Sequence, residues 1–310
     1  MDKAQQNNLQ RAFEEEVYLL GQPPLRHYLR FVEDFALDSS MDRASYVDEW
    51  RRANDYYREL EDREAGIADN VEVRDLDPGL VPLAEAVRLD ARYRHTFSTL
   101  PTSFGVVELD RLVIFQPRVT QDFVNALKSE LGSAPDRDTV FHFCLPLKPS
   151  AAPVSIQRVG SQRYVFRCES TDFHFQESVL LKPGQIQGHD NYGTIAGAVG
   201  LMVGFGSNWL NVIRDENRLL LHNGYHRAYA LRELGITHAP CIIQTVTRRD
   251  ELDVIAKREV AENPGYYFAA RRPPLLKDFF DPNLRKVLRV RKLTKMVEIN
   301  FEVKELTVPV

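Results

Sequence analysis

The stretch Arg218-Leu-Leu-Leu-His-Asn-Gly-Tyr-His-Arg-Ala-Tyr-Ala-Leu-Arg-Glu-Leu-Gly235 decides the fold that we expect for this chain. Its apolar run, Leu219 to Leu221, predicts a buried strand, and Asn223-Gly224 predicts a sharp turn with a positive φ. Apolar residues at helical spacing then predict a helix that ends at Gly235. A strand, a glycine turn and a helix in this order direct backbone N–H groups and the positive end of the helix dipole toward an anion.

His226 and Arg227 fall in the first turn of that helix, where their side chains can bind the same anion. An arginine at a helix N-terminus opposes the dipole unless an anion is present, so Arg227 is a candidate phosphate contact, with a structural salt bridge as the alternative. His226 is a candidate for donating to a phosphate oxygen or transferring a proton, with capping or core packing as the alternative. Asn223 and Gly224 are needed for backbone shape under either interpretation.

Length and composition favour a globular protein of the cytoplasm. The 310 residues suffice for one large domain or two ordinary ones, and 44% hydrophobic residues, 27% charged residues and a net charge of −4 are typical of soluble proteins. No window approaches the roughly 18 consecutive apolar residues of a membrane span. The start of the chain lacks the pattern of a signal peptide. Cys144, Cys168 and Cys241 are widely spaced, which favours a reducing compartment. Cys144 and Cys241 lie inside apolar runs, and we expect them to be buried small hydrophobic residues, with reactive thiols as the alternative.

Charge is unevenly distributed along the chain. Residues 1–70 carry 16 acidic and 9 basic side chains, a net of −7, which leaves 28 acidic and 31 basic, a net of +3, for residues 71–310. Six lysines and arginines occur between 285 and 295 with no acid among them. A nucleic-acid contact is one interpretation of this run. We favour a solvated strand face or a surface that meets the acidic N-terminal part.

In this part of the chain a strand is followed by Asn223 to Arg227, a helix, Leu-Gly-Ile, a proline and an apolar strand. This order resembles the ParB/sulfiredoxin superfamily of phosphate- and nucleotide-binding domains. A second patch, Glu108 to Arg118, resembles the opening strand and Pro-Arg turn of a ParB-type domain. The resemblance covers about 105–130 and 208–248, and it implies an α+β fold of ParB/sulfiredoxin type. It also implies that phosphate is bound by a set of six residues: Asn223, Gly224, Tyr225, His226, Arg227 and Arg118.

The chain departs from the best-known members of the superfamily in this motif. Tyr225 occupies the slot of the sulfiredoxin catalytic cysteine, and a phenol cannot form the thiol-bound intermediate of that reaction. ParB proteins that bind CTP carry Gly-Glu-Arg-Arg, whereas this chain has Gly-Tyr-His-Arg. We see no helix-turn-helix segment after residue 248. We therefore expect neither peroxiredoxin repair nor chromosome partitioning. A kinase of the superfamily shares the His-Arg ending, and such an enzyme needs a carboxylate base.

Periodicity and turn residues predict the organisation along the chain. Helices are expected over Leu9–Leu20, over Leu25–Leu37, after a cap at Ser39-Ser40 or Asp42, and over Leu80–Tyr93, 120–132 and 249–260. Strands are expected over 106–115, 139–147, 154–159, 163–167, 239–246 and 297–303. The glycine-containing run 195–205 predicts a small-residue helix or a buried run. We thus expect an acidic helical region at 1–100, the ParB/sulfiredoxin-like domain at 101–270 with an insertion at about 135–207, and a basic linker with a C-terminal strand at 271–310.

Three functions fit these features. The first is an enzyme that uses a nucleotide, ATP or CTP with magnesium, for phosphoryl transfer or hydrolysis, with His226 and Arg227 as the catalytic candidates. The second is a non-catalytic nucleotide-sensing or nucleic-acid-associated regulatory protein. The third is a structural or assembly protein that lost the ligand, which a site blocked by Tyr225 or Tyr229 would favour. The C-terminal strand can complete a sheet in its own chain or in a partner, so an oligomer is compatible with the sequence.

Histidines and one aspartate elsewhere in the chain do not favour a metal site. The candidate ligands lack H-x-x-x-H or H-x-D spacing; they are His142, His174, His189 and Asp172. We interpret 184–193 as a polar loop over the phosphate site, because long glycine-containing loops are common lids.

Overall fold

The computed structural model describes residues 13–22, 24–37, 42–148, 152–170, 172–188 and 193–309. The chain divides into two compact units, one formed by residues 1–148 and 209–292 and the other by 149–208 and 293–310. Helices and several small sheets confirm the expected α+β fold class. The boundaries of the units do not coincide with the divisions that the sequence suggested at 100 and 270.

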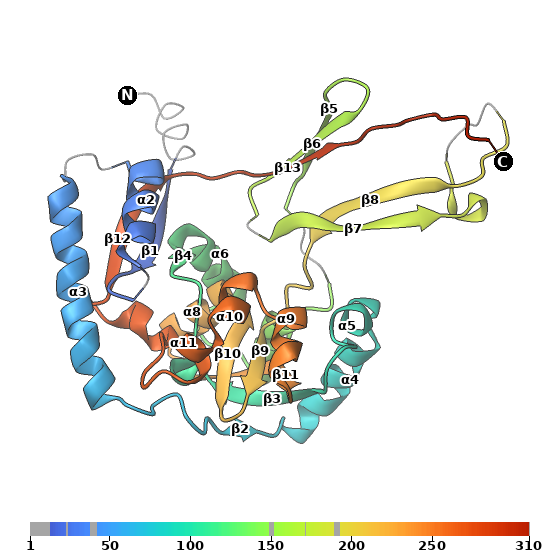
Figure 1. The fold of residues 1–310 in the computed structure, drawn as a ribbon. Coiled ribbons are helices and arrows are strands. Elements are labelled where there is room, and N and C mark those ends of the chain that lie inside the picture. The colour runs from blue at the N-terminus through green and yellow to red at the C-terminus, as the bar shows by residue number, and fades with distance from the viewer. Residues whose placement is uncertain are drawn as a thin grey trace, which may run out of the picture. The chain divides into compact units, whose positions relative to one another are not determined.

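A five-stranded sheet lies in the first unit, with the strand order β10-β9-β11-β3-β2 (Figure 1). Strand β11 pairs with β9 in parallel and with β3 in antiparallel orientation, and β9 and β10 form an antiparallel pair. The expected buried strands at 219–221 and 239–246 are confirmed, since both runs are nearly all buried. The strand bounds are β2 Val73–Arg74, β3 Thr102–Glu108, β9 Asn211–Asp215, β10 Arg218–Asn223 and β11 His238–Val246.

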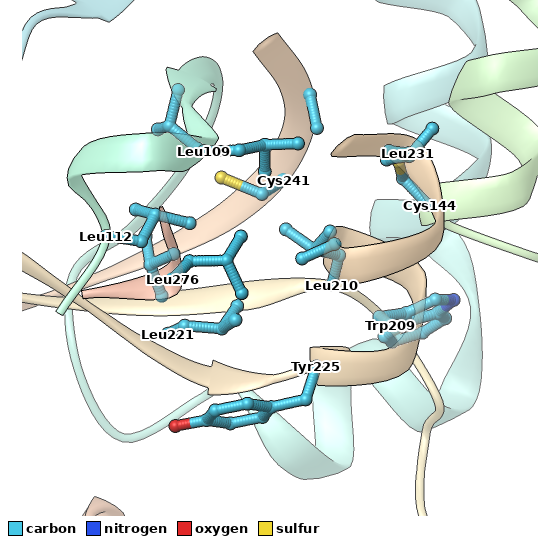
Figure 2. Packing of buried hydrophobic residues seen from close by; sticks show 14 of the residues in the cluster. Leu109, Leu112, Cys144, Trp209, Leu210, Leu221, Tyr225, Leu231, Cys241 and Leu276 are labelled. Atoms are coloured by element: carbon cyan, nitrogen blue, oxygen red, sulfur yellow. The ribbon is translucent and has the colours of Figure 1, made fainter. Parts of the chain in front are cut away.

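The main core packs around this sheet and holds the turn that follows β10. Figure 2 shows Leu210, Leu221 and Tyr225 among the clustered apolar side chains. Cys144 and Cys241 are fully buried and unbridged in the same cluster, so their interpretation as small hydrophobic residues is confirmed. The backbone of the candidate site is therefore anchored in the main buried cluster of the first unit.

Several expected helices are confirmed. Helix α2 spans Leu25–Phe35, and α3 spans Arg43–Arg63 after Asp42, whose carboxylate accepts from the Ser45 N–H at 2.8 Å. Ser39-Ser40 lies outside the described residues. Helix α6, Gln121–Leu131, ends at Gly132 with φ +80°, and α8, Tyr225–Glu233, is followed by Gly235, also with φ +80°. The expected helix over Leu80–Tyr93 is divided into α4, Val81–Leu89, and α5, Ala91–Thr96, by the extended backbone of Asp90.

The helix expected over Leu9–Leu20 is wrong for its described part. Residues Phe13–Leu19 form strand β1, which lies between β12, Arg285–Arg291, and β4, Arg118–Thr120. Glu15 is directly opposite Arg289 across the pair, so tertiary pairing of opposite charges outweighs the helix propensity of glutamate. The basic run within β12 meets the acidic N-terminal segment, which is the interpretation we favoured.

Other elements also differ from the expectation. Residues Arg137–Cys144 form helix α7, not a strand, because Asp136 caps its first turn by accepting from the Thr139 N–H. The helix over 249–260 is divided into α9, Leu252–Ile255, and α10, Arg258–Glu262, which α11, Pro264–Phe268, follows. The strand expected over 106–115 ends at Glu108. Short 3₁₀ helices occupy Pro78–Leu80, Leu109–Arg111, Pro183–Gln185, Arg249–Glu251 and Leu276–Phe280.

The start of the expected basic linker is also wrong, since the Arg271–Pro274 segment is part of the folded unit. Arg272 is 1% exposed and forms a two-bond ion pair with the buried Asp278 carboxylate, at 2.5 and 3.0 Å. Its Nε also donates to Glu64 at the end of α3, at 2.9 Å. This buried network ties residues 271–278 to the N-terminal helices.

The second unit contains two small sheets. One has the order β13-β6-β5, and the strands expected over 154–159 and 163–167 are confirmed as an antiparallel hairpin around Gly160. The other is a two-stranded antiparallel ribbon of β7 and β8. Strand β8 contains most of the run 195–205, which is thus neither a helix nor buried. The bounds are β5 Ser155–Arg158, β6 Arg163–Cys168, β7 Phe173–Leu181, β8 Ala198–Phe205 and β13 Lys295–Asn300.

Candidate functional site

The turn between β10 and α8 requires glycine at position 224. Gly224 has φ +93° and precedes the first residue of α8. A Cβ at this position would lie 2.9 Å from the Cα of Leu210, which is backbone and cannot move aside cheaply. The Asn223 side chain accepts from the Gly224 N–H at 2.9 Å and fixes the turn from the other side. The sequence thus predicted the correct role for both residues.

Tyr225 holds the segment that leads to Arg118. Its side chain is 4% exposed, and its hydroxyl oxygen accepts from the backbone N–H of Phe115 at 2.9 Å and of Gln116 at 3.3 Å. The Tyr225 ring also meets the Phe115 ring edge to face, with 5.5 Å between centroids. Burial raises the pKa of the Tyr225 phenol, so the hydroxyl remains protonated. The residue in the cysteine slot of the motif is therefore a structural acceptor.

His226 lies at the contact between the first turns of α8 and α6. Its Nε2 accepts from the Thr120 N–H at 3.1 Å, and its ring meets Phe123 with 5.0 Å between centroids. Burial lowers the pKa of His226 to about 4, and the positive charges of Arg118 and Arg227 contribute to the decrease. The imidazole is therefore neutral at pH 7. Because Nε2 is an acceptor, we assign the proton to Nδ1.

Arg118 is brought next to this histidine, although 107 residues separate the two in the sequence. The Arg118 guanidinium lies 3.3 Å from Glu16 Oε1 and 4.9 Å from the centroid of the Phe31 ring. Its side chain is 33% exposed, so solvent reaches it. Thr120, which donates its N–H to His226, also donates its hydroxyl to Glu16 at 2.8 Å. The two patches that the sequence singled out thus form one cluster.

Glu16 is the member of this cluster that sequence reasoning missed, because we expected it on a glutamate-rich helix. It is 2% exposed, and in the described part of the chain its Oε2 has no hydrogen-bond partner. Burial raises the pKa of Glu16, and Arg118 and Thr120 only partly oppose that increase. A buried carboxyl with a perturbed pKa beside an arginine is frequent at functional sites, although structural ion pairs share this property. The adjacent apolar residues Val17 to Leu20 were the signal that this segment is buried.

The Arg227 side chain lies against α7, whereas Arg118 contacts other elements. It is 9% exposed, and its guanidinium lies 5.9 Å from the centroid of the Phe143 ring in α7. Arg118 packs against α2 and β1. Both guanidinium groups lower the pKa of His226, so both lie within electrostatic reach of that ring. The two arginines thus contact different elements, and both act electrostatically on the neutral imidazole of His226.

The other candidates lie apart from this cluster or outside the described residues. Tyr229 is fully buried and stacks on Phe280 at 4.7 Å between centroids. His142 is exposed, and the Nδ1 of His174 lies 2.7 Å from the Asp172 carbonyl oxygen. Residues 189–192, which include His189, lie outside the described residues. Within the described ranges, no group of three potential metal ligands comes together.

His222, at the end of β10, was expected to face the turn, and its half-buried ring lies at that position. In the part of the chain that the structure describes, neither of its ring nitrogens has a hydrogen-bond partner, and both are shielded from solvent. Burial lowers the pKa of His222 to about 4, with a smaller contribution from Lys257.

No family model, no curated protein and no solved structure matches this chain. The resemblance to the ParB/sulfiredoxin superfamily therefore depends on the motif residues and on the order of the elements around them. Among the described residues, none of the helices is both long enough and apolar enough to cross a membrane.

Proposed function

We propose that the protein binds a phosphorylated ligand, such as a nucleotide, through Arg118 and the first turn of α8. The observation that supports this proposal best is that Arg118 lies near the N-terminus of α8, since the N–H of Thr120, two residues after Arg118, donates to His226 in the first turn of that helix. An arginine beside the positive end of a helix favours an anion with several oxygens. The resemblance to a nucleotide-binding superfamily points to the same class of ligand.

Arg118 is the group that a phosphate would engage first, because its side chain is partly exposed. A phosphate oxygen would then replace Glu16 Oε1 as its partner. Burial raises the pKa of Glu16, so this carboxyl takes up a proton more readily than an exposed one and releases the arginine at lower cost. The Nδ1–H of His226 and backbone N–H groups at the start of α8 would supply neutral hydrogen bonds.

The cluster supports binding better than phosphoryl transfer with magnesium. A carboxyl group acts as a general base or binds magnesium in its ionised form, and burial of Glu16 opposes ionisation. The second candidate is a structural protein without a ligand. The hydrogen bonds that Tyr225 and His226 accept from backbone groups favour it, because these side chains already have a structural use.

The test is a set of melting temperatures with ATP, CTP, GTP, ADP and pyrophosphate, each with and without magnesium. A ligand at one hundred times its Kd adds about 2.7 kcal/mol to the free energy of unfolding, which corresponds to several degrees. The variant is Glu16→Gln with Arg118→Gln, which removes both charges together and leaves no buried carboxylate unpaired. The control is Arg248→Gln, an exposed arginine of the same unit that pairs with Asp250.

We expect at least one ligand to raise the melting temperature of the wild type and of the control, and to raise that of the double variant much less. An equal increase in the double variant would contradict the proposed site. Absence of any increase in the wild type would contradict ligand binding and favour the structural candidate.

A further inference from the structure

Strands β7 and β8 of the second unit form a two-stranded ribbon (Figure 1). The pairing register places seven apolar side chains and one serine on one face of this ribbon, of which Phe173 at its base is buried. The four cross-strand pairs of this face are Phe173 with Phe205, Phe175 with Val203, Ser178 with Leu201, and Leu180 with Val199. Toward the far end of the ribbon, Leu180 is 79% exposed and Val199 is 71% exposed. Exposed apolar surface of this extent marks an interaction site.

The backbone of the ribbon also indicates an interaction site. An isolated pair of strands is marginally stable in water, and β7 and β8 pair only with each other in the sheets of the described chain. Each strand therefore presents an open edge, which is a template for a further strand. A hydrocarbon environment would leave the polar groups of these edges without partners, so a lipid bilayer is a poor occupant.

The same unit carries a segment that fits such an edge. Residues 301–309, which we call the tail, follow β13, belong to no strand and are exposed throughout. Apolar and charged residues alternate at its start, as is typical of a half-buried strand. Four of its side chains are large, apolar and 40–81% exposed: Phe301, Val303, Leu306 and Val308. Phe301 is held at the base of the tail, where its N–H donates to the Gln162 carbonyl at 3.2 Å and its ring stacks on Tyr164. In the described part of the chain, residues 302–309 join no sheet, although they belong to the same unit as the ribbon.

We propose that the protein forms a dimer in which the tail of each copy adds a strand to the β7–β8 ribbon of the other copy. Each copy has one ribbon with an open edge and one tail. When two copies exchange tails, each tail pairs with a ribbon and each ribbon gains a strand, so the assembly stops at two copies. Residues 149–208 and 293–310 together carry seven acidic and six basic side chains, a net of −1. This near-neutral charge does not repel a second copy, and it lacks the positive charge that a nucleic acid would need.

The interface area explains why both parts are needed. Two strands of eight residues form a face of roughly 27 by 10 Å. A specific interface buries about 800 Å² on each partner. Contact between two ribbon faces alone would therefore fall short, and the two exchanged tails supply the additional strands and apolar side chains.

Light scattering after gel filtration tests the assembly directly. We expect the wild type to have the mass of two chains, and a variant that lacks residues 301–310 to have the mass of one. Leu180→Asp with Val199→Asp should also give single chains. The matched control is Leu89→Asp with Val254→Asp, at a leucine and a valine of the first unit that are 73% and 68% exposed, and it should remain a dimer.

Cysteine crosslinking tests the exchange between copies. The native cysteines are buried, so a new thiol reacts alone. A mixture of Leu306→Cys protein with Leu180→Cys protein should form a mixed disulfide on mild oxidation, and a mixture of Leu306→Cys with Leu89→Cys should not. A wild type that is a single chain at high micromolar concentration would overturn the proposal, and vesicle binding by that single chain would assign the ribbon to a membrane. A dimer that survives both the aspartate substitutions and the tail deletion would overturn it as well.

Discussion

The two glycines that flank α8 allow a paired test of how the candidate turn is built. Gly224 and Gly235 have similar positive φ values, +93° and +80°. A Cβ at Gly224 would lie 2.9 Å from the Cα of Leu210, whereas a Cβ at Gly235 would have no heavy atom within 4 Å. Gly224→Ala and Gly235→Ala therefore share the backbone strain and the loss of unfolded-state entropy, and they differ in the steric overlap.

These contacts determine how much each variant should lower the free energy of unfolding. A left-handed backbone costs an L-residue about 1–2 kcal/mol, and overlap with a well-packed neighbour adds about 1–3 kcal/mol. Alanine restricts the unfolded chain and offsets about 0.4–1 kcal/mol of this loss in both variants. We expect Gly235→Ala to lower the free energy of unfolding by about 1 kcal/mol and Gly224→Ala to lower it by about 3 kcal/mol.

Urea unfolding followed by tryptophan fluorescence measures this difference. Both tryptophans of the chain, Trp50 and Trp209, belong to the first unit, so the signal reports the unit that contains α8. Equal losses for the two variants would refute the claim that close contact with Leu210, rather than backbone conformation alone, requires glycine at 224.

Three further predictions follow from buried polar groups. Tyr225→Phe leaves two backbone donors without their acceptor and should lower the free energy of unfolding by about 2–4 kcal/mol in urea; a loss below about 0.5 kcal/mol would show that the hydroxyl is not a structural acceptor. Asp278→Ala removes the fully buried partner of Arg272, leaves Glu64 as its remaining carboxylate, and should lower the free energy of unfolding by about 3–5 kcal/mol. Asp62→Ala breaks an exposed pair and should lower it by at most about 1 kcal/mol, and similar melting temperatures for the two variants would contradict the buried network. The pKa of His222 falls from 6.5 to about 4 on folding, so the free energy of unfolding of the wild type should decrease by up to about 3 kcal/mol through this residue as the pH decreases from 6.5 to 4. The free energy of unfolding of His222→Leu should decrease less over this pH range, and parallel profiles of unfolding free energy against pH would refute the assignment.

The turn and helix at the candidate site were predictable from the sequence because local chemistry determines them. Asn223-Gly224 requires a special backbone conformation, and Gly235 ends the helix that follows. The apolar run in β10 has no polar residue to place outside, so its burial also follows from the sequence. Local patterns of this kind do not depend on distant partners.

The partners of the site residues could not be predicted, because tertiary pairing determines them. Phe13–Leu19 is rich in glutamate and looks helical, and only its pairing with β12 and β4 makes it a strand. The sequence therefore did not identify Glu16 as part of the site. The acceptor roles of Tyr225 and His226 depend on backbone N–H groups more than 100 residues away in the sequence. A single sequence carries no signal for such pairs.

Hydrogen exchange with mass spectrometry tests the proposed ligand site most directly. The wild type is compared with and without the nucleotide or pyrophosphate, at millimolar concentration with magnesium. We predict slower exchange in peptides that cover 115–122 and 224–230, and unchanged exchange in the β7–β8 ribbon. Unchanged exchange in both of these peptides with every ligand would contradict the claim that Arg118 and the first turn of α8 bind phosphate.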